Sequence, residues 1–193
     1  MTETKDISFQ EFTQLALRTE SKVTSANLNV QAFVDLLELF ITVGTLLDYT
    51  KKGIFYNNYT KYDENYDALV NKLMAKVADF NSSSEKYSRV NHDSLNFRLI
   101  HGLLGAVTES SEIAEHLLKY ITTGDVDKVG IGEEFSDIDW YKAITFDELQ
   151  LEENTCRTNV INKLKVRFPD KYDDAAAANR NLEEERKKLE ENL

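Results

Sequence analysis

The sequence predicts an all-α helix bundle, and two observations lead to that fold class. Residues that break regular structure are few, with 7 glycines and 1 proline in 193 residues, whereas sheet-rich folds need such residues at their many turns. Apolar residues recur at three- and four-residue spacing in most segments, while the alternation typical of strands is scarce. The chain is long enough for one globular domain with a real core.

The first half of the chain carries three predicted helices. One covers residues 6–20 and has an apolar stripe. The second runs from about residue 30 to residue 49, and Gly53, shortly after it, is expected to end the helix. Its apolar residues nearly encircle it, which predicts burial in a core or in a subunit interface. The third covers residues 66–80, and the polar segment 81–88 after it is the best linker candidate.

Four tyrosines lie between the second and third of these helices, at positions 56, 59, 62 and 66. Their rings could stack on a nucleotide base. Packing against neighbouring helices or a partner subunit is the commoner use of aromatic side chains, and the spacing fits both interpretations.

The second half carries four predicted helices. Gly124 is expected to stop the first of them and Pro169 the third. The last helix is polar, with Glu and Lys pairs at i, i+4, so we expect it to be solvated. The four helices span about residues 94–122, 133–146, 156–168 and 177–193.

Charge and composition restrict the partners and the compartment. A net charge of -11 argues against nucleic acid and against an anionic membrane as partners. Carboxylates that hold Mg²⁺ can still bind a polyphosphate through the cation. Cys156 is the only cysteine, the N-terminus lacks the apolar core of a signal peptide, and Asp35 and Glu38 interrupt the longest apolar stretch. We therefore expect a soluble, cytoplasmic protein.

Two acidic residues one turn apart, Glu109 and Glu112, lie on the helix predicted over 94–122. At about 100° per residue they fall nearly opposite an apolar stripe. Taken alone, this pattern favours an ordinary solvated face over half of a metal site. The stripe consists of Leu103, Val107, Ala114, Leu117, Leu118 and Ile121.

A second acidic pair, Glu134 and Asp137, has the same spacing but continues an apolar face that carries Trp140, Tyr141 and Ile144. Carboxylates on such a face need a partner or a metal ion. The two pairs together offer four oxygen donors, which suit a hard cation such as Mg²⁺ or Mn²⁺. A di-iron centre is not expected, because no histidine has a glutamate three residues before it.

A basic pair, Lys163 and Arg167, lies at i, i+4 on the helix predicted over 156–168, with Asn159 on the same face. Such a face could bind phosphate. For this segment taken alone, an ordinary solvated basic face is the commoner explanation.

The order of these parts resembles the all-α nucleoside triphosphate pyrophosphohydrolases of the MazG type. These enzymes share a motif that consists of Glu-x-x-Glu, a spacer of variable length and Glu-x-x-Asp. The matching residues here are Glu109-Ser-Ser-Glu112 and Glu134-Phe-Ser-Asp137, with 21 residues between them. The resemblance covers about Asn96 to Arg186. Three blocks carry it, similar to the family's two metal helices and to the tail of phage-type members: residues 98–117, 133–141 and 162–186.

This resemblance implies hydrolysis of a (d)NTP between the α- and β-phosphates to (d)NMP and pyrophosphate, in nucleotide-pool control. It implies Mg²⁺, or Mn²⁺ in its place, bound by Glu109, Glu112, Glu134 and Asp137. The ions would orient the triphosphate and activate the attacking water, with Glu112 and Glu109 as the catalytic candidates. Phosphate charge would be neutralised by cationic and polar side chains. The candidates are Lys163, Arg167, Asn159, Lys171 and Arg180.

The resemblance also implies an architecture. Residues 9–20 correspond to the family's leading helix, so residues from about 25 to 93 become a helical insertion within a single domain of residues 1–193. Neighbouring subunits commonly complete the site in this family, which implies a homo-oligomer, first a dimer and second a tetramer. The alternative is a catalytically silent interaction module that binds a partner through the inserted helices.

Overall fold

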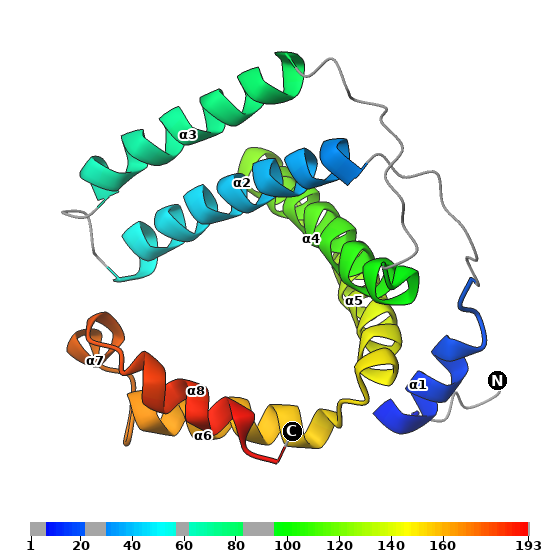
Figure 1. Ribbon diagram of the computed structural model, residues 1–193. Helices are drawn as coiled ribbons and strands as arrows, with labels where there is room; N and C mark the ends of the chain where they lie inside the picture. The colour runs from blue at the N-terminus through cyan, green and yellow to red at the C-terminus, as the bar shows by residue number, and fades with distance from the viewer. Residues whose placement is uncertain (1–6, 22–29, 57–61, 83–94, 193) are drawn as a thin grey trace. The chain divides into compact units, whose positions relative to one another are not determined.

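The computed structural model describes residues 7–21, 30–56, 62–82 and 95–192, and it contains helices and no strand in these ranges (Figure 1). The all-α prediction is confirmed. The described helices are α1 (Phe9–Leu17), α2 (Val30–Tyr56), α3 (Tyr62–Ser82), α4 (Phe97–Thr123), α5 (Lys128–Leu149), α6 (Glu153–Arg167), α7 (Asp174–Ala178) and α8 (Leu182–Glu190).

The chain divides into two compact units. One consists of Met1–Thr24 with Leu95–Leu193, and the other of Ser25–Ser94. The boundaries of the second unit nearly coincide with those of the insertion expected from the sequence. The described part of each unit is helical, and no helix in the described ranges is long and apolar enough to cross a membrane.

The Ser25–Ser94 unit consists of α2 and α3, which pack side by side and are joined by an ion pair between Lys76 and Glu38. The expected end of α2 at Gly53 is wrong, since the helix continues through this buried glycine to Tyr56. A glycine lowers helix stability by only about 1 kcal/mol, so packing can override it. The side chains of Tyr56, Tyr59 and Tyr62 lie outside the described part, so base stacking by them stays a prediction.

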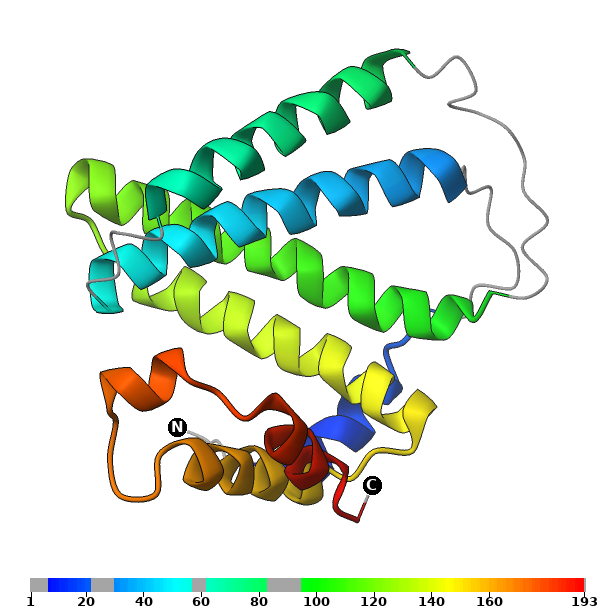
Figure 2. The same ribbon diagram turned by 60° about the vertical axis from the view of Figure 1, so that its left-hand side comes forward.

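The other unit is organised by the antiparallel hairpin of α4 and α5 (Figure 2). Glycines on α4 let the two helices approach closely. A Cβ atom on Gly105 would lie 2.1 Å from the ring of Tyr141, and one on Gly102 would lie 2.3 Å from Oγ1 of Thr145. Only glycine leaves room for α5 at these two positions.

The turn between α4 and α5 is defined by caps at both helix ends. Gly124 ends α4 with a φ of 79°, in the left-handed region where glycine is favoured, as the sequence predicted. Asp127 then accepts a hydrogen bond from the backbone N–H of Gly130 and starts α5 at Lys128. The expected start near Glu133 is therefore wrong, because this N-cap stabilises a first turn that contains a glycine.

Helix α1 packs against α5 near the N-terminus of α4. The indole Nε1 of Trp140 donates a hydrogen bond of 2.9 Å to Oγ1 of Thr19. The guanidinium of Arg98 makes two bonds, of 2.6 and 2.9 Å, to the carboxylate of Glu20. Ala143 and Ile144 of α5 are fully buried beside these contacts. The α4–α5 hairpin is thus anchored at the end where α5 finishes.

The C-terminal part contains α6, α7 and α8, of which α6 and α8 lie side by side (Figure 1). Helix α6 ends before Pro169, as predicted, and Phe168 is its C-cap. The predicted helix over 177–193 is shorter, because it begins at Leu182 with Asn181 as the N-cap. The i, i+4 pair between Glu183 and Lys187 forms at 3.0 Å.

Candidate metal centre

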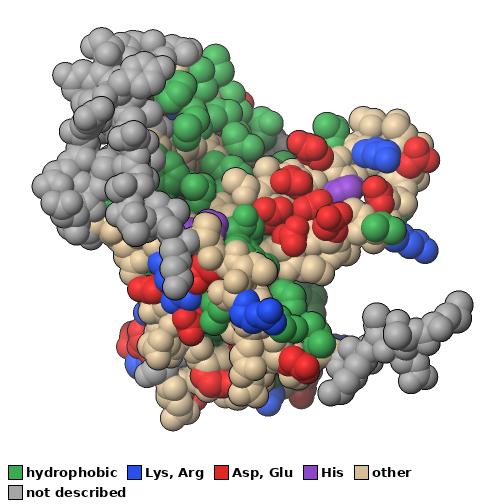
Figure 3. Space-filling model, turned by 90° about the vertical axis from the view of Figure 1, so that its right-hand side faces the viewer, with side chains coloured by type: hydrophobic (Ala, Val, Ile, Leu, Met, Phe, Trp, Pro, Cys, Tyr) green, Lys and Arg blue, Asp and Glu red, His purple; other side chains and the backbone are tan. Residues whose placement is uncertain are grey.

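Three carboxylates from two helices meet on the α4–α5 hairpin. Ligand oxygens of Glu109 and Glu112 on α4 and of Glu134 on α5 all lie within 4.8 Å of one another. Glu109 is 9% exposed and Glu134 8% exposed, whereas Glu112 is open to solvent. In the space-filling view, acidic side chains gather over this hairpin with a histidine among them (Figure 3).

The buried face of α4 is the acidic one. Gly102, Gly105 and Glu109 are its buried residues, and their spacing of three and four places them on one side of the helix, against α5. The predicted apolar stripe points elsewhere: Leu103, Leu117, Leu118 and Ile121 are each more than half exposed. Close approach at small residues, and not the hydrophobic stripe, selects the face that contacts α5.

Asp137 belongs electrostatically to the same cluster. The pKa of Glu109 is raised, first because the carboxyl is buried, then by the negative charge of Glu112 and by hydrogen bonding to Glu134, with Asp137 adding to the effect. The pKa of Tyr141 is raised as well, by burial and then by the nearby charges of Glu109, Asp137 and Glu112. The four carboxylates predicted as metal ligands therefore share one negative field.

No lysine or arginine in the described ranges forms an ion pair with any of these four carboxylates. The imidazole of His116 lies beside the cluster, with its Nε2 3.7 Å from Oε1 of Glu134. Buried carboxylates without a cationic partner are costly, and a bound cation removes that cost. The donor set consists of carboxylate oxygens, so it fits Mg²⁺ or Mn²⁺.

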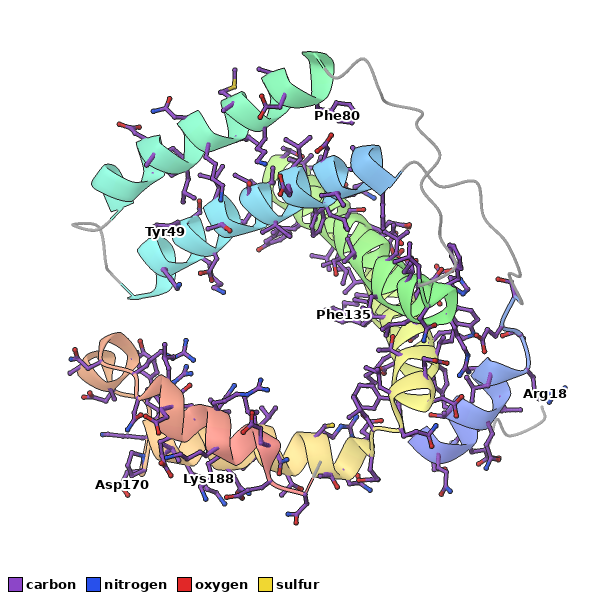
Figure 4. All side chains as sticks on the ribbon, in the orientation of Figure 1. Arg18, Tyr49, Phe80, Phe135, Asp170 and Lys188 are labelled. Atoms are coloured by element: carbon purple, nitrogen blue, oxygen red, sulfur yellow. The ribbon has the colours of Figure 1, made fainter. Side chains whose placement is uncertain are left out.

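The cluster lies at the surface of the hairpin. Phe135, labelled in Figure 4, directly follows Glu134 on α5. Its side chain is more than half exposed. Asp137 is also exposed. A ligand can therefore approach the carboxylates without entering the interior of the unit.

Asn159, predicted as a phosphate ligand, has a structural partner on α8. Its side chain is 3% exposed. The amide Nδ2 donates hydrogen bonds of 3.1 Å to the carbonyl of Leu189 and 2.6 Å to the carbonyl of Glu191. Asn159 thus satisfies carbonyl groups at the C-terminus of α8, which otherwise lack intrahelical partners.

Arg167 and Arg180, also predicted to bind phosphate, enclose a carboxylate of α8. Glu185 is 2% exposed and accepts bonds of 2.9 and 2.5 Å from Arg167 and of 3.3 and 2.7 Å from Arg180. The two guanidinium groups lower the pKa of Glu185 to about 2. Lys163 is half-buried on α6, and Lys171 is exposed after it.

The structure therefore separates the predicted residues into two sets. Three of the four acidic residues, Glu109, Glu112 and Glu134, come together on α4 and α5, and Asp137 lies outside this group of three, whereas three members of the phosphate-binding set have partners in or next to α8. Sequence reasoning missed Glu185, and it left His116 without a role. The signal for His116 was its position one turn after Glu112. Comparison of the chain with models of protein families, with curated protein sequences and with solved structures gave no match.

Proposed function

We propose that this chain is a Mg²⁺-dependent nucleoside triphosphate pyrophosphohydrolase, able to use Mn²⁺, that converts a (d)NTP to (d)NMP and pyrophosphate. One observation carries the proposal. Carboxylate oxygens of Glu109, Glu112 and Glu134, from two helices, lie within 4.8 Å of one another. The resemblance of the motif around them to MazG-type enzymes supplies the reaction class.

In this proposal Glu109, Glu112, Glu134 and Asp137 hold the cation. When bound, Mg²⁺ neutralises the triphosphate and increases the acidity of the attacking water. Glu112 is the exposed member of the three clustered carboxylates, so it accepts the proton of that water as the oxygen attacks phosphorus. The bond between the α-phosphorus and the bridging oxygen breaks, and pyrophosphate leaves with the bridging oxygen.

Phosphate charge has to be neutralised by cationic side chains. Lys163 and Lys171 remain proposed for this role, together with Asn159, Arg167 and Arg180. The bonds that Arg167 and Arg180 make to Glu185 are of the kind that a phosphate oxygen would accept. To reach a substrate, these two arginines would have to exchange Glu185 for it.

A homo-oligomer, first a dimer and second a tetramer, is part of the proposal. Its support is the exposed apolar surface of single helices. Leu117, Leu118 and Ile121 on α4 and Ile41 on α2 are each more than half exposed. Exposed apolar side chains that cluster on one helix, as the three on α4 do, are typical of protein interfaces.

The test is hydrolysis of a panel of (d)NTPs with Mg²⁺, read as monophosphate and pyrophosphate formed. Glu112→Gln and Asp137→Asn are expected to abolish turnover and to keep the helical circular dichroism spectrum. Glu115→Gln is the matched control, because this exposed acid lies on α4 outside the clustered carboxylates. Unchanged turnover in either site variant would contradict the site assignment.

A second candidate function is a catalytically silent interaction module. The observation that favours it is the separate Ser25–Ser94 unit, on which Leu36, Leu47 and Met74 are more than half exposed. Such side chains could bind a protein partner. Absence of product across the whole (d)NTP panel, with a folded protein, would favour this function over the enzyme.

A further inference from the structure

A histidine that the proposed chemistry does not use stands beside the acidic cluster. His116 lies on α4 one turn after Glu112, and its side chain is 19% exposed. Its Nε2 is 3.7 Å from Oε1 of Glu134. This separation is longer than a hydrogen bond. The two atoms would form a hydrogen bond if they came closer by about 0.5 Å, to the upper limit of roughly 3.2 Å for an N–H···O bond.

The position of the imidazole depends on a glycine of α5. A Cβ atom on Gly130 would lie 2.4 Å from Cε1 and 2.7 Å from Nε2 of His116. Any side chain at residue 130 would therefore push the ring away from its present place. Gly132, two residues along the same helix, has nothing within 4 Å of an added Cβ. An added Cβ would therefore meet His116 at Gly130 and nothing at Gly132, and an experiment can use this difference.

A second carboxylate faces the same imidazole. Asp127 caps α5 through a hydrogen bond of 3.0 Å from the backbone N–H of Gly130. That bond is the main reason why the pKa of Asp127 is lowered, and the charge of His116 contributes to the lowering. The cap, the glycine and the histidine therefore form one local arrangement at the start of α5, next to Glu134.

We propose that His116 is a positioning residue of the metal centre: its Nε2–H orients the carboxylate of Glu134, and Gly130 admits the ring. The proposal rests on the proposed function, because it concerns the same cation site. Ligating carboxylates are commonly held by an outer hydrogen-bond donor, and loss of such a partner costs roughly 10–100-fold in metal affinity. A histidine that only filled space would not affect metal affinity in this way.

The experiment measures Mn²⁺ affinity by electron paramagnetic resonance of the free ion. His116→Ala and Gly130→Ala are each expected to weaken Mn²⁺ binding by roughly 10–100-fold. Gly132→Ala, the matched control, should bind Mn²⁺ like the wild type. His116→Gln keeps an N–H donor, so it should recover part of the loss seen in His116→Ala.

The double variant His116→Ala/Gly130→Ala separates positioning from general damage to the helix. With the ring removed, the added Cβ has nothing to displace, so the double variant should bind Mn²⁺ no more weakly than His116→Ala alone. Additive losses would overturn the proposal. Circular dichroism spectra of all variants show whether the helices are kept.

The outcomes also distinguish this proposal from the proposed function. If Glu112→Gln abolishes Mn²⁺ binding while His116→Ala and Gly130→Ala bind like the wild type, the positioning role is wrong and the metal centre stands. If the wild type itself binds no Mn²⁺, the proposed function fails and the role of His116 fails with it.

Discussion

Two buried glutamates of this chain have opposite surroundings. Glu185 on α8 is held between the guanidinium groups of Arg167 and Arg180, and its pKa falls to about 2. Glu109 on α4 is held beside Glu112 and Glu134, and its pKa is raised. Burial is similar, since the first residue is 2% and the second 9% exposed. Burial raises the pKa of both carboxyls, and the surrounding charge therefore decides that the pKa of Glu185 is lowered while that of Glu109 is raised further.

The comparison separates a carboxylate that has structural partners from one that we propose to be functional. The charge of Glu185 is already neutralised, so its place in the fold needs no ligand. No lysine or arginine of the described ranges pairs with the carboxylates around Glu109, so their mutual repulsion opposes folding, and we propose that a bound cation relieves it. A site whose groups destabilise the folded chain in the absence of ligand is typical of function.

The largest effect is expected at Glu185. The change Glu185→Gln removes the buried carboxylate that Arg167 and Arg180 share, and breaking a buried ion pair costs about 3 kcal/mol of unfolding free energy. Urea unfolding measures this loss. Glu183→Gln on the same helix, at an exposed site, should change stability by less than about 0.5 kcal/mol. Equal stability of both variants would show that the buried cluster is not structural.

A smaller loss is expected when the helices that form the acidic cluster are pushed apart. A Cβ on Gly105 would collide with the ring of Tyr141, so Gly105→Ala should cost about 2 kcal/mol and weaken Mn²⁺ binding. Gly132→Ala adds a methyl group where nothing lies within 4 Å, and it should leave both quantities nearly unchanged. Full Mn²⁺ affinity in Gly105→Ala would contradict the link between helix approach and site.

Bound metal should stabilise the fold through the acidic cluster around Glu109 and not through the cluster around Glu185. At a free Mg²⁺ concentration about tenfold above its Kd, the wild type should gain about 1.4 kcal/mol in unfolding free energy. Thermal unfolding with and without Mg²⁺ measures the gain. Glu109→Gln should lose the gain and, without metal, be no less stable than the wild type, because the substitution relieves repulsion. A destabilised, still Mg²⁺-responsive Glu109→Gln would overturn the assignment.

The smallest effect is a pH dependence of opposite sign at the two glutamates. The stabilising contribution of Glu185, whose pKa is lowered to about 2, is present above its unfolded pKa and is lost as the pH falls toward 2. Glu109, whose pKa is raised, contributes stability below its unfolded pKa of about 4.5, and that contribution disappears as the pH rises through the raised value.

Urea unfolding between about pH 4 and pH 7 in metal-free buffer tests this sign. Relative to the wild type, Glu109→Gln should become more stable as the pH rises, because it removes a carboxyl that resists ionisation in the folded state. Glu183→Gln should show no such trend. The same trend in both variants would mean that the repulsion around Glu109 is not specific to the cluster.

Local rules in the sequence were enough for the fold class and for several helix ends. Few glycines and prolines predicted the helices, Gly124 predicted the end of α4, and Pro169 the end of α6. The spacing of the two acidic pairs indicated four candidate carboxylate ligands, and the resemblance to MazG-type enzymes implied that they bind the metal; the structure brings three of the four together. Such signals are readable because they act within a few residues along the chain.

Long-range contacts decided the rest. Helical periodicity predicted that Glu109 points away from the apolar stripe. It did not predict that the acidic face of α4 contacts α5, because this contact depends on Gly102 and Gly105 meeting a partner helix. Nor does spacing show that Arg167 binds Glu185, 18 residues away. The hydrophobic pattern shows which face of a single helix is most apolar. Contacts between two helices depend on the volume and charge of the side chains on both helices.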